Sequence, residues 1–252
     1  MQVLINHIRK EYGQEFDSLQ PKLTQKIDSL RTNAGNMYAG IRLADDGKVA
    51  GTINLKDVEI LYLLVRYFKP KVIFEIGTWI GTSAMVMAEA AKVNDNGAII
   101  YTCDNSQYYA LENSYEGIIK TINGYSYSAI DTINEKIDFV FSDGELTKTT
   151  LKKMLGKLNS DSIIATHDYT RPSEKGVRNF YRVQMATFGA YNYLLPKNIE
   201  STIAVLLPYK GRYGLEIYTK YRLSIYLFAL YLFVTTKIYI PFRRIYRKIS
   251  NY

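Results

Sequence analysis

The sequence predicts an α/β fold built on a doubly wound sheet of seven strands, five parallel and the last two in an antiparallel hairpin. A short apolar, β-branched run at 72–76 is followed by a glycine turn and a helical stretch at 84–93. Strand-like and helical patterns then alternate through the middle of the chain. Two final strands, 202–209 and 215–220, flank a glycine-containing turn, and strands joined in this way must pair antiparallel. These three observations set the fold class.

The composition is that of a globular protein made in a reducing compartment. At 252 residues and 47% hydrophobic content, the chain is long enough to bury a substantial core. Its single cysteine excludes an internal disulfide, and its first residues lack the pattern of a signal peptide. We therefore expect a cytoplasmic protein. The net charge of +8 permits anionic partners, but much of the excess lies near the C-terminus.

Residues 1–53 are expected to form a helical N-terminal extension. Helical spacing covers residues 1–32, with a second helix beginning at Pro21. Residues 33–53 hold four glycines and show no clear period, so they are expected to form a loop. Two interpretations of that loop remain open, a cover that folds over a bound substrate and a plain connection.

The core domain is placed at 54–220. Its expected strands after 72–76 are 98–103, 125–130, 137–142 and 162–166, and its expected helices are 55–68, 84–93, 109–122, 147–158 and 172–188. In open α/β sheets, ligands bind beyond the carboxyl ends of the strands. The polar side chains expected at that edge are Glu75, Asp104, Asp131, Asp143, His167 and Asp168.

The turn after the first strand carries the most specific motif, Glu75-Ile-Gly-Thr-Trp-Ile-Gly-Thr-Ser83. A dinucleotide site needs G-x-G-x-x-G, and Trp79 stands where the second glycine would be. The motif instead resembles motif I of class I S-adenosylmethionine (AdoMet)-dependent methyltransferases, whose Rossmann-like sheet also closes with an antiparallel strand. The resemblance implies AdoMet as cofactor. It would be bound by Glu75, Gly77, Thr78, Gly81, Thr82 and Ser83 of the turn, by Asp104 at the ribose hydroxyls and by Asp131 near the adenine.

Two dipeptides follow later strands, Asp143-Gly144 after 137–142 and His167-Asp168 after 162–166. Together with motif I and the later run Lys175-Gly-Val-Arg178, they resemble the small-molecule and sugar O-methyltransferases, over roughly residues 53–220. Some of those enzymes hold Mg²⁺ with carboxylates at these two strand ends, which implies Asp143 and Asp168 as catalytic residues and metal ligands. The sequence departs from the catechol-type enzymes, because Leu146 stands where they carry a lysine base.

His167 is the remaining catalytic candidate. An unperturbed imidazole pKa near 6.5 suits a general base that removes the proton of an acceptor hydroxyl at neutral pH. The alternative interpretation is a histidine that only forms hydrogen bonds to neighbouring loops. Methyl transfer itself is an in-line displacement that needs alignment above all.

The C-terminal tail, residues 221–252, differs from the rest of the chain. Its fourteen uncharged residues at 223–236 would be apolar around the whole circumference of a helix, and a basic run follows at 243–248. The apolar stretch is shorter than a typical membrane-spanning helix. Three interpretations remain, a helix lying on an anionic membrane surface at the cytoplasmic face, a spanning segment and a homo-oligomer interface.

The function favoured by these observations is AdoMet-dependent transfer of a methyl group to a hydroxyl of a saccharide or another small molecule. An NAD-linked oxidoreductase is disfavoured by Trp79 and by the terminal hairpin. A nucleic-acid methyltransferase fits the positive charge, but the core shows no N-P-P-Y-like motif, so nucleic acid is not the expected partner. A non-catalytic nucleotide-binding module would keep the glycine turn and need not place His167 and Asp168 beside it.

Overall fold

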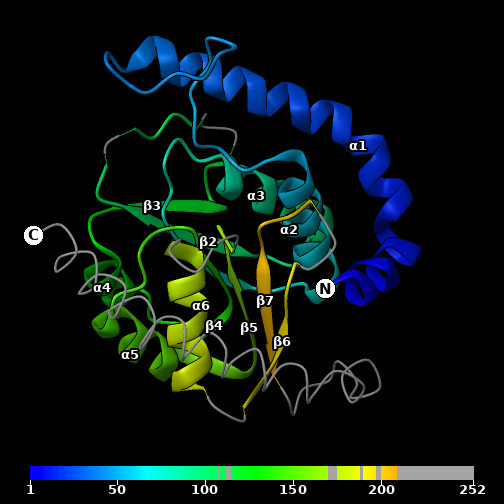
Figure 1. The fold of residues 1–252 in the computed structure, drawn as a ribbon, viewed down its shortest axis with the longest axis vertical. Helices are drawn as coiled ribbons and strands as arrows, with labels where there is room; N and C mark the ends of the chain where they lie inside the picture. Colours follow the sequence, from blue (N-terminus) through cyan, green and yellow to red (C-terminus); the bar gives the residue numbers. More distant parts are fainter. Residues whose placement is uncertain (107, 112–114, 170–174, 188–189, 197–199, 209–252) are drawn as a thin grey trace, which may run out of the picture.

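The computed structural model describes residues 1–106, 108–111, 115–169, 175–187, 190–196 and 200–208 (Figure 1). Within these residues, one open sheet lies between two layers of helices, and each layer packs a separate hydrophobic core against its face of the sheet. The predicted α/β, Rossmann-like, doubly wound class is confirmed.

The strands follow the order β3-β2-β1-β4-β5-β7-β6 across the sheet. The parallel strands are β1 (Val72–Ile76), β2 (Ile99–Asp104), β3 (Ile119–Asn123), β4 (Ile137–Ser142) and β5 (Leu158–Thr166). β7 (Ala204–Pro208) pairs antiparallel with both β5 and β6 (Tyr191–Leu194). The strand order reverses between β1 and β4, and ligands of open α/β sheets bind at such a point.

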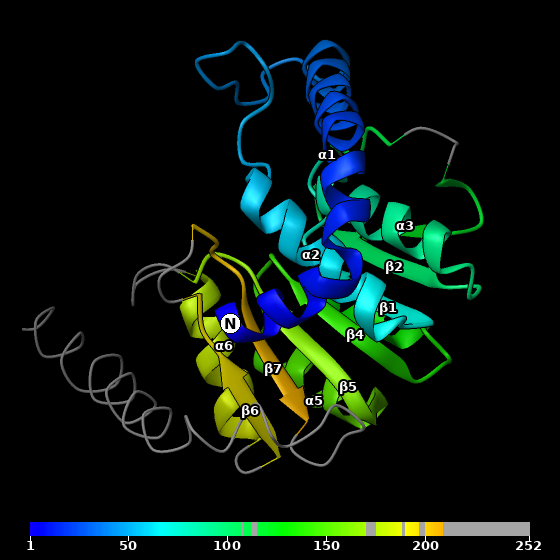
Figure 2. The ribbon, with the colours of Figure 1, turned by 90° about the vertical axis from the view of Figure 1, so that its right-hand side faces the viewer.

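Helices cover both faces of the sheet. On one face lie α2 (Leu55–Phe68) and α3 (Thr82–Asn94), with α1 (Gln2–Met37) running across their outer side (Figure 2). On the other lie α4 (Ser126–Ala129), the short 3-10 helix η2 (Ile130–Thr132), α5 (Lys148–Lys157) and α6 (Lys175–Ala186). Alternate strand residues enter the two cores, Ile73 and Phe139 on the first side, Phe74 and Val140 on the second. All four are completely buried, as parallel strands between two helical layers require.

α1 is one continuous helix, which corrects the prediction of a helix boundary at Pro21 and of a loop that begins at residue 33. A proline inside a helix removes a backbone hydrogen bond and costs about 3 kcal/mol. Ile8 and Phe16 before the proline, and Leu23 and Ile27 after it, are buried in the same core. Because burying each such side chain contributes about 1.5–3 kcal/mol, their shared burial offsets the cost of Pro21.

The third strand lies at 119–123 and not at 125–130, and the described parts of 109–122 form no α-helix. The sequence analysis placed the Asn123-Gly124 turn before the strand, whereas the turn follows it, with Gly124 at φ +146°. Lys120 and Thr121 are exposed because β3 is an edge strand. The apolar pattern of a buried strand is therefore missing there.

The closing hairpin pairs β7 with β6, whereas the sequence analysis paired 202–209 with 215–220. Residues 215–220 and the tail at 221–252 lie outside the described residues. Among the residues that are described, no helix is both long enough and apolar enough to cross a bilayer.

The connection between α1 and α2 is tied to α1 and to the turn after β1. Arg31 Nε of α1 donates a hydrogen bond to the carbonyl oxygen of Val49 at 2.8 Å. The next carbonyl, of Ala50, accepts from Trp79 Nε1 at 3.1 Å. The residues after Ala50 thereby reach the carboxyl edge of the sheet, where they form part of a cavity wall.

Candidate active site

The turn after β1 depends on two glycines. Gly77 has φ +96° and Gly81 φ +98°, a region that other residues rarely adopt. A Cβ atom on Gly77 would lie 2.5 Å from the backbone nitrogen of Gly144, because the ends of β1 and β4 are in close contact. A Cβ atom on Gly81 would lie 2.6 Å from the side chain of Leu111. The turn therefore presents bare backbone at the edge of the sheet.

A buried polar network lies beneath this turn. The Glu75 carboxylate is fully buried and accepts hydrogen bonds from Ser83 Oγ and Thr102 Oγ1. The hydroxyl of Thr78 lies 2.5 Å from that of Thr102. Burial raises the pKa of Glu75 to about 8, although the two hydrogen bonds act in the opposite direction. Of the turn residues predicted to bind the cofactor, Gly77 lines the cavities described below, and the others, Glu75, Thr78, Gly81, Thr82 and Ser83, shape the turn.

Asp104 ends β2 and faces the turn. Its Oδ2 accepts a hydrogen bond from the backbone nitrogen of Trp79 at 2.8 Å, and its Oδ1 accepts from that of Ser106 at 2.8 Å. Each carboxylate oxygen can accept more than one hydrogen bond. Asp104 can therefore fix the turn and still bind a hydroxylated ligand.

Two adjoining cavities lie along this edge of the sheet. The first, about 260 Å³, lies beyond the ends of β1 to β4 and is lined by residues that include Cys103, Asn105, Gly124, Tyr125, Ser126, Tyr127 and Thr147. The second, about 410 Å³, is lined by Gly51, Thr52, Trp79, Asp143, His167, Asp168 and Lys175. Gly77, Asp104 and Gly144 line both cavities. The two cavities thus form one site that spans the reversal of strand order.

Asp131 does not lie where the sequence analysis placed it. It belongs to η2, its side chain is exposed, and its Oδ2 pairs with Lys153 Nζ at 2.5 Å. It lines neither cavity. The error follows from the misplaced third strand, because the residues that come after β3 are Tyr125 and Tyr127. These two rings stack 5.4 Å apart and line the first cavity.

His167, directly after β5, is held between carboxylates. Its Nδ1 lies 3.0 Å from Asp143 Oδ1 and 3.4 Å from Asp168 Oδ1, and its Nε2 lies 3.1 Å from Asp57 Oδ2. Burial alone would lower the pKa of His167, but the hydrogen bonds to Asp143 and Asp57 raise it to about 10. The imidazole is therefore protonated at neutral pH, with both nitrogens donating, and has no lone pair to accept a proton.

Asp57 is a member of this cluster that the sequence analysis missed. It is fully buried in the first turn of α2 and accepts hydrogen bonds from Ser201 Oγ at 2.6 Å and from the backbone nitrogen of Thr202 at 2.8 Å, besides that from His167. Burial would raise the pKa of Asp57, but these hydrogen bonds hold it below its usual value. The available signal was a carboxylate three residues after the capping Asn54, a pattern that indicates only a helix start.

Lys175, the first residue of α6, adds a positive charge to the cluster. Its Nζ lies 3.4 Å from Asp143 Oδ1 and 3.8 Å from Asp168 Oδ2. His167, Asp143 and Asp168 each offer one atom that could coordinate a metal ion, and these three atoms lie within 4.8 Å of one another. The pKa of Asp143 lies below its usual value, because hydrogen bonds and charges from His167 and Lys175 outweigh the effect of burial.

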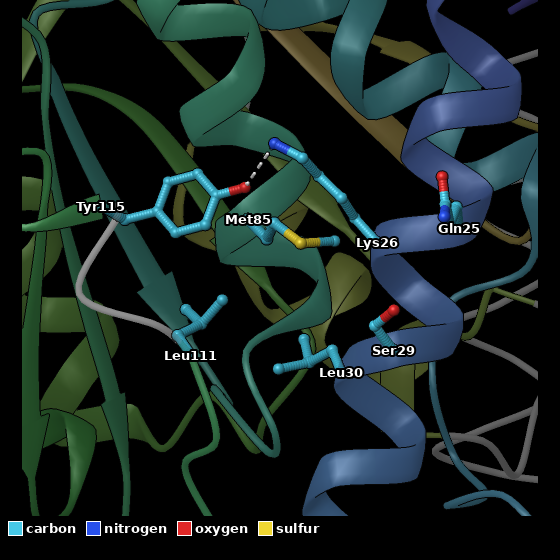
Figure 3. Close-up of a pocket in the computed structure, with 7 residues that line it drawn as sticks. All are labelled: Gln25, Lys26, Ser29, Leu30, Met85, Leu111 and Tyr115. Atoms are coloured by element: carbon cyan, nitrogen blue, oxygen red, sulfur yellow. Dashed lines mark hydrogen bonds between the residues drawn. The ribbon is translucent and has the colours of Figure 1, made fainter.

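A further cavity, of about 240 Å³, lies between α1 and α3 (Figure 3). Its lining includes Lys26 of α1, Met85 of α3, and Tyr115. Lys26 Nζ and the Tyr115 hydroxyl each donate a hydrogen bond to Glu89 Oε1 at 2.7 Å. This cavity shares no lining residue with the two at the sheet edge, so it is separate from the candidate active site.

Comparison with known proteins gives a family match and a set of similar folds. Residues 74–169 match a methyltransferase domain family, and no curated protein sequence matches the chain. The fold is similar to that of the methyltransferase PaMTH1 of Podospora anserina bound to S-adenosylhomocysteine, with 18% identity over 79% of this chain and 95% of that one and a TM-score of 0.52. It is similar to an O-methyltransferase of Bacillus cereus in complex with S-adenosylhomocysteine, with 16% identity over 75% and 90% of the two chains and a TM-score of 0.52. It is also similar to the O-methyltransferase TomG of Streptomyces achromogenes in complex with AdoMet, with 15% identity over 71% and 88% and a TM-score of 0.50.

The matched segment begins in β1 and ends just after β5. It therefore contains the glycine turn, Asp104, Asp143 and the His167-Asp168 pair, and the structural neighbours share the doubly wound fold that brings these residues to one edge. The chain therefore contains a methyltransferase domain at residues 74–169, and its fold is shared by solved methyltransferases in complex with AdoMet or S-adenosylhomocysteine.

Proposed function

We propose that the protein is an O-methyltransferase that transfers the methyl group of AdoMet to a hydroxyl of a saccharide or another small polar molecule. The observation that carries the proposal is the second cavity, in which Asp143, His167 and Asp168 adjoin the glycine turn and Asp104. Two of the similar structures are O-methyltransferases by name, and one is a complex with AdoMet, which supports the same reaction here.

The residues at the edge fit AdoMet. Asp104 would accept hydrogen bonds from the ribose hydroxyls, and Tyr125 and Tyr127 offer ring faces to the adenine. Gly77 and Gly144 line both cavities and carry no side chain, so the methionine part can pass close to their backbone. When bound, AdoMet supplies an electrophilic methyl group.

The second cavity suits a hydroxylated acceptor. Its carboxylates and its ammonium group can bind hydroxyls, and Trp79 adds an aromatic surface against which the CH groups of a sugar ring can pack. In the reaction, a C–O bond forms as the C–S bond breaks, and the hydroxyl proton must leave. The alignment of the acceptor is the main contribution that the protein makes.

Within this site, we assign Asp143 as the residue that accepts the proton of the acceptor hydroxyl, and we assign a positioning role to His167. His167 Nδ1 and Lys175 Nζ both contact Asp143 Oδ1. No described residue donates a hydrogen bond to Asp143 Oδ2, so that oxygen is available to the acceptor hydroxyl. The protonated imidazole, itself held by Asp57, would fix the orientation of the carboxylate. The base role that the sequence analysis gave to His167 is not part of this proposal, because its imidazole already holds both protons.

A pH–rate profile distinguishes the two assignments. With Asp143 as the proton acceptor, kcat/KM should be flat from about pH 6 to pH 8 and should fall as His167 loses its proton near pH 10. A histidine base would instead give a rate that rises through about pH 6.5. The His167→Asn variant should keep its AdoMet affinity, because His167 positions Asp143 and not the cofactor.

The function itself is tested by calorimetry with AdoMet, followed by transfer of labelled methyl groups to free, nucleotide-linked and lipid-linked saccharides. We expect stoichiometric AdoMet binding and label on a hydroxyl of one of these acceptors. Label on nucleic acid would favour a nucleic-acid methyltransferase. Binding of AdoMet without transfer to any acceptor would favour a non-catalytic module.

The sequence analysis also predicted a Mg²⁺ ion at Asp143 and Asp168. The side chains around these two carboxylates fit such an ion poorly. Mg²⁺ demands near-octahedral oxygen ligation. The site offers two carboxylates, one imidazole and an ammonium group that lies within ion-pair distance of both carboxylates. No step of the proposed reaction therefore passes through a metal ion.

The tail and the domain boundaries stay predictions from the sequence. We propose that residues 221–252 hold the protein at an anionic membrane surface on the cytoplasmic side, since a basic run follows an apolar segment. A spanning segment and a homo-oligomer interface are the alternatives. The extension at 1–53 and the core domain at 54–220 are kept as predicted.

A further inference from the structure

We propose that the ammonium group of Lys175 takes the place of a divalent metal ion between Asp143 and Asp168, so that the site works without one. The exclusion of a divalent ion by Lys175 follows from the positions of these side chains alone. The role of Lys175 in methyl transfer rests on the function proposed above.

The first observation is that Lys175 and a metal ion would use the same oxygens. The potential metal-ligand atoms of Asp143, His167 and Asp168 lie within 4.8 Å of one another, close enough to coordinate one ion. Lys175 Nζ lies 3.4 Å from Asp143 Oδ1 and 3.8 Å from Asp168 Oδ2. A divalent ion bound to these carboxylates would lie beside the ammonium group, and like charges repel strongly where water is partly excluded. Lys175 would have to leave before the ion could bind.

The second observation is the anchoring of Lys175. The next residue, Gly176, is packed so tightly against the backbone of His167 and Asp168 that a Cβ there would lie 2.5 Å from the carbonyl carbon of Asp168. The start of α6 therefore lies directly against the end of β5, which places Lys175 beside Asp168. A positive charge in the first turn of a helix is disfavoured by the helix dipole, so the two carboxylates, and not the helix, account for the position of the ammonium group.

The positive charge of Lys175 would act on the oxygen of the acceptor hydroxyl. An ammonium group has three N–H donors, and two of them can face Asp143 and Asp168. The third is available to the acceptor oxygen, where it would stabilise the negative charge that develops as the hydroxyl proton passes to Asp143. Lys175 keeps its own protons throughout. The C–O bond forms and the C–S bond breaks as in the proposed reaction, with no additional reactant.

Electron paramagnetic resonance of Mn²⁺ tests the ion-binding statement on the full-length chain. The six-line signal of free Mn²⁺ reports the unbound ion. We expect the wild type to leave this signal unchanged at equal protein and ion concentrations. The Lys175→Met variant, which keeps the length of the side chain without its charge, should bind Mn²⁺ at least about tenfold more tightly. Stoichiometric binding by the wild type, or no gain in the variant, would overturn the proposal.

Two further variants control this result. Lys153→Met removes an ammonium group from Asp131, a single exposed carboxylate, and should gain no Mn²⁺ binding. A gain equal to that of Lys175→Met would show that loss of any lysine suffices, which contradicts the proposal. Lys175→Gln serves if the methionine variant does not fold by circular dichroism, and its expected result is the same.

Activity is the second readout. Methyl transfer by the wild type should be insensitive to EDTA, and Lys175→Met should lower kcat about 10²-fold, the usual loss for one charge-stabilising donor, with AdoMet affinity unchanged. Inhibition of the wild type by EDTA would overturn the proposal. If no form methylates any acceptor, the proposed function fails, whereas the Mn²⁺ result still decides whether Lys175 occupies a cation site.

Discussion

A side-chain carbon at Gly176, in the first turn of α6, would overlap the carbonyl oxygen of His167 at the end of β5. The contact couples a structural element to the candidate active site, since α6 carries Lys175 and β5 leads into the His167-Asp168 pair. Asp168 itself has φ +58°, an unusual value for a residue other than glycine. The backbone of His167 and Asp168 is therefore in direct contact with the start of α6.

This contact predicts a large effect of a single methyl group. Gly176→Ala should lower the free energy of unfolding by about 2–4 kcal/mol, because neither backbone segment can yield without moving the end of β5. Gly156→Ala is the matched control, since Gly156 lies in α5 with no atom within 4 Å of the added Cβ. There the change should be neutral or should stabilise by up to about 1 kcal/mol. Urea unfolding of both variants measures the difference, and equal effects would contradict the steric argument.

The buried Glu75 predicts a pH dependence of defined sign. Its pKa is about 8 in the folded protein against an ordinary value of 4.5, so the folded state binds the proton more tightly. The contribution of Glu75 to stability is therefore fully present below pH 4.5 and is lost as the pH rises through 8. Relative to Glu75→Gln, the wild type should lose up to about 1.4 kcal/mol of unfolding free energy per pH unit in that window. Urea unfolding of both proteins at several pH values checks this, and a constant difference would show that Glu75 stays ionised.

The elements that the sequence predicted well are those buried on both faces. β1 and β4 lie inside the sheet between two layers of helices, and their mostly apolar sequences identify them as strands. β3 and β6 lie at the two edges. An edge strand needs less burial, so β3 was misplaced by several residues and β6 was not predicted at all.

The residues of the candidate site also fall into two groups, those at strand ends, which the sequence predicted, and those on helices, which it did not. Asp104, Asp143, His167 and Asp168 directly follow or end parallel strands, so predicting the strands was enough to bring them to one edge. Asp57 and Lys175 belong to helices. Their presence depends on how α2 and α6 dock against the sheet, and contacts between residues so distant in sequence leave no local pattern. The protonation state of His167 depends on Asp57, so it could not be predicted from the sequence either.

Asp57 should matter as an anion and not only as a hydrogen-bond acceptor. Asp57→Asn keeps the size of the side chain but leaves Nε2 of the His167 imidazolium without its carboxylate partner. We expect a loss of about 2–4 kcal/mol in unfolding free energy, because breaking one side of a buried charge pair is costly. Methyl transfer should fall while AdoMet affinity stays constant. Asp138→Asn, which alters a carboxylate that binds the backbone at the opposite end of β1, is a control that should spare the reaction. Equal losses of activity in both variants would remove Asp57 from the site.

Asp104 and Asp131 make a direct test of where the cofactor binds. Asp104→Ala should weaken AdoMet binding by about 1–3 kcal/mol, the loss expected for hydrogen bonds to a charged group, and calorimetry measures it. Asp131→Ala should leave the affinity unchanged, because its carboxylate is exposed and pairs with Lys153. Unchanged affinity in Asp104→Ala, with the fold intact, would remove Asp104 from the site. A loss confined to Asp131→Ala would restore the placement of the adenine near that residue.

The tail predicts binding to anionic membranes. Fourteen uncharged residues at 223–236 must be covered by lipid, by a second subunit or by the rest of the chain, since an apolar patch of that size is rarely left in water. The basic run at 243–248 suits anionic headgroups better than a protein interface, where unpaired charges are costly to desolvate. The full-length chain should therefore sediment with vesicles that contain anionic lipid. Changing both Arg243 and Arg244 to Gln should weaken that binding about 30-fold, at about 1 kcal/mol for each charge. Deleting residues 222–252 should abolish vesicle binding and preserve AdoMet affinity. If the full-length chain ignores vesicles and forms a dimer that the deletion converts to a monomer, the tail is a subunit interface, because only a second chain then remains to cover the apolar segment.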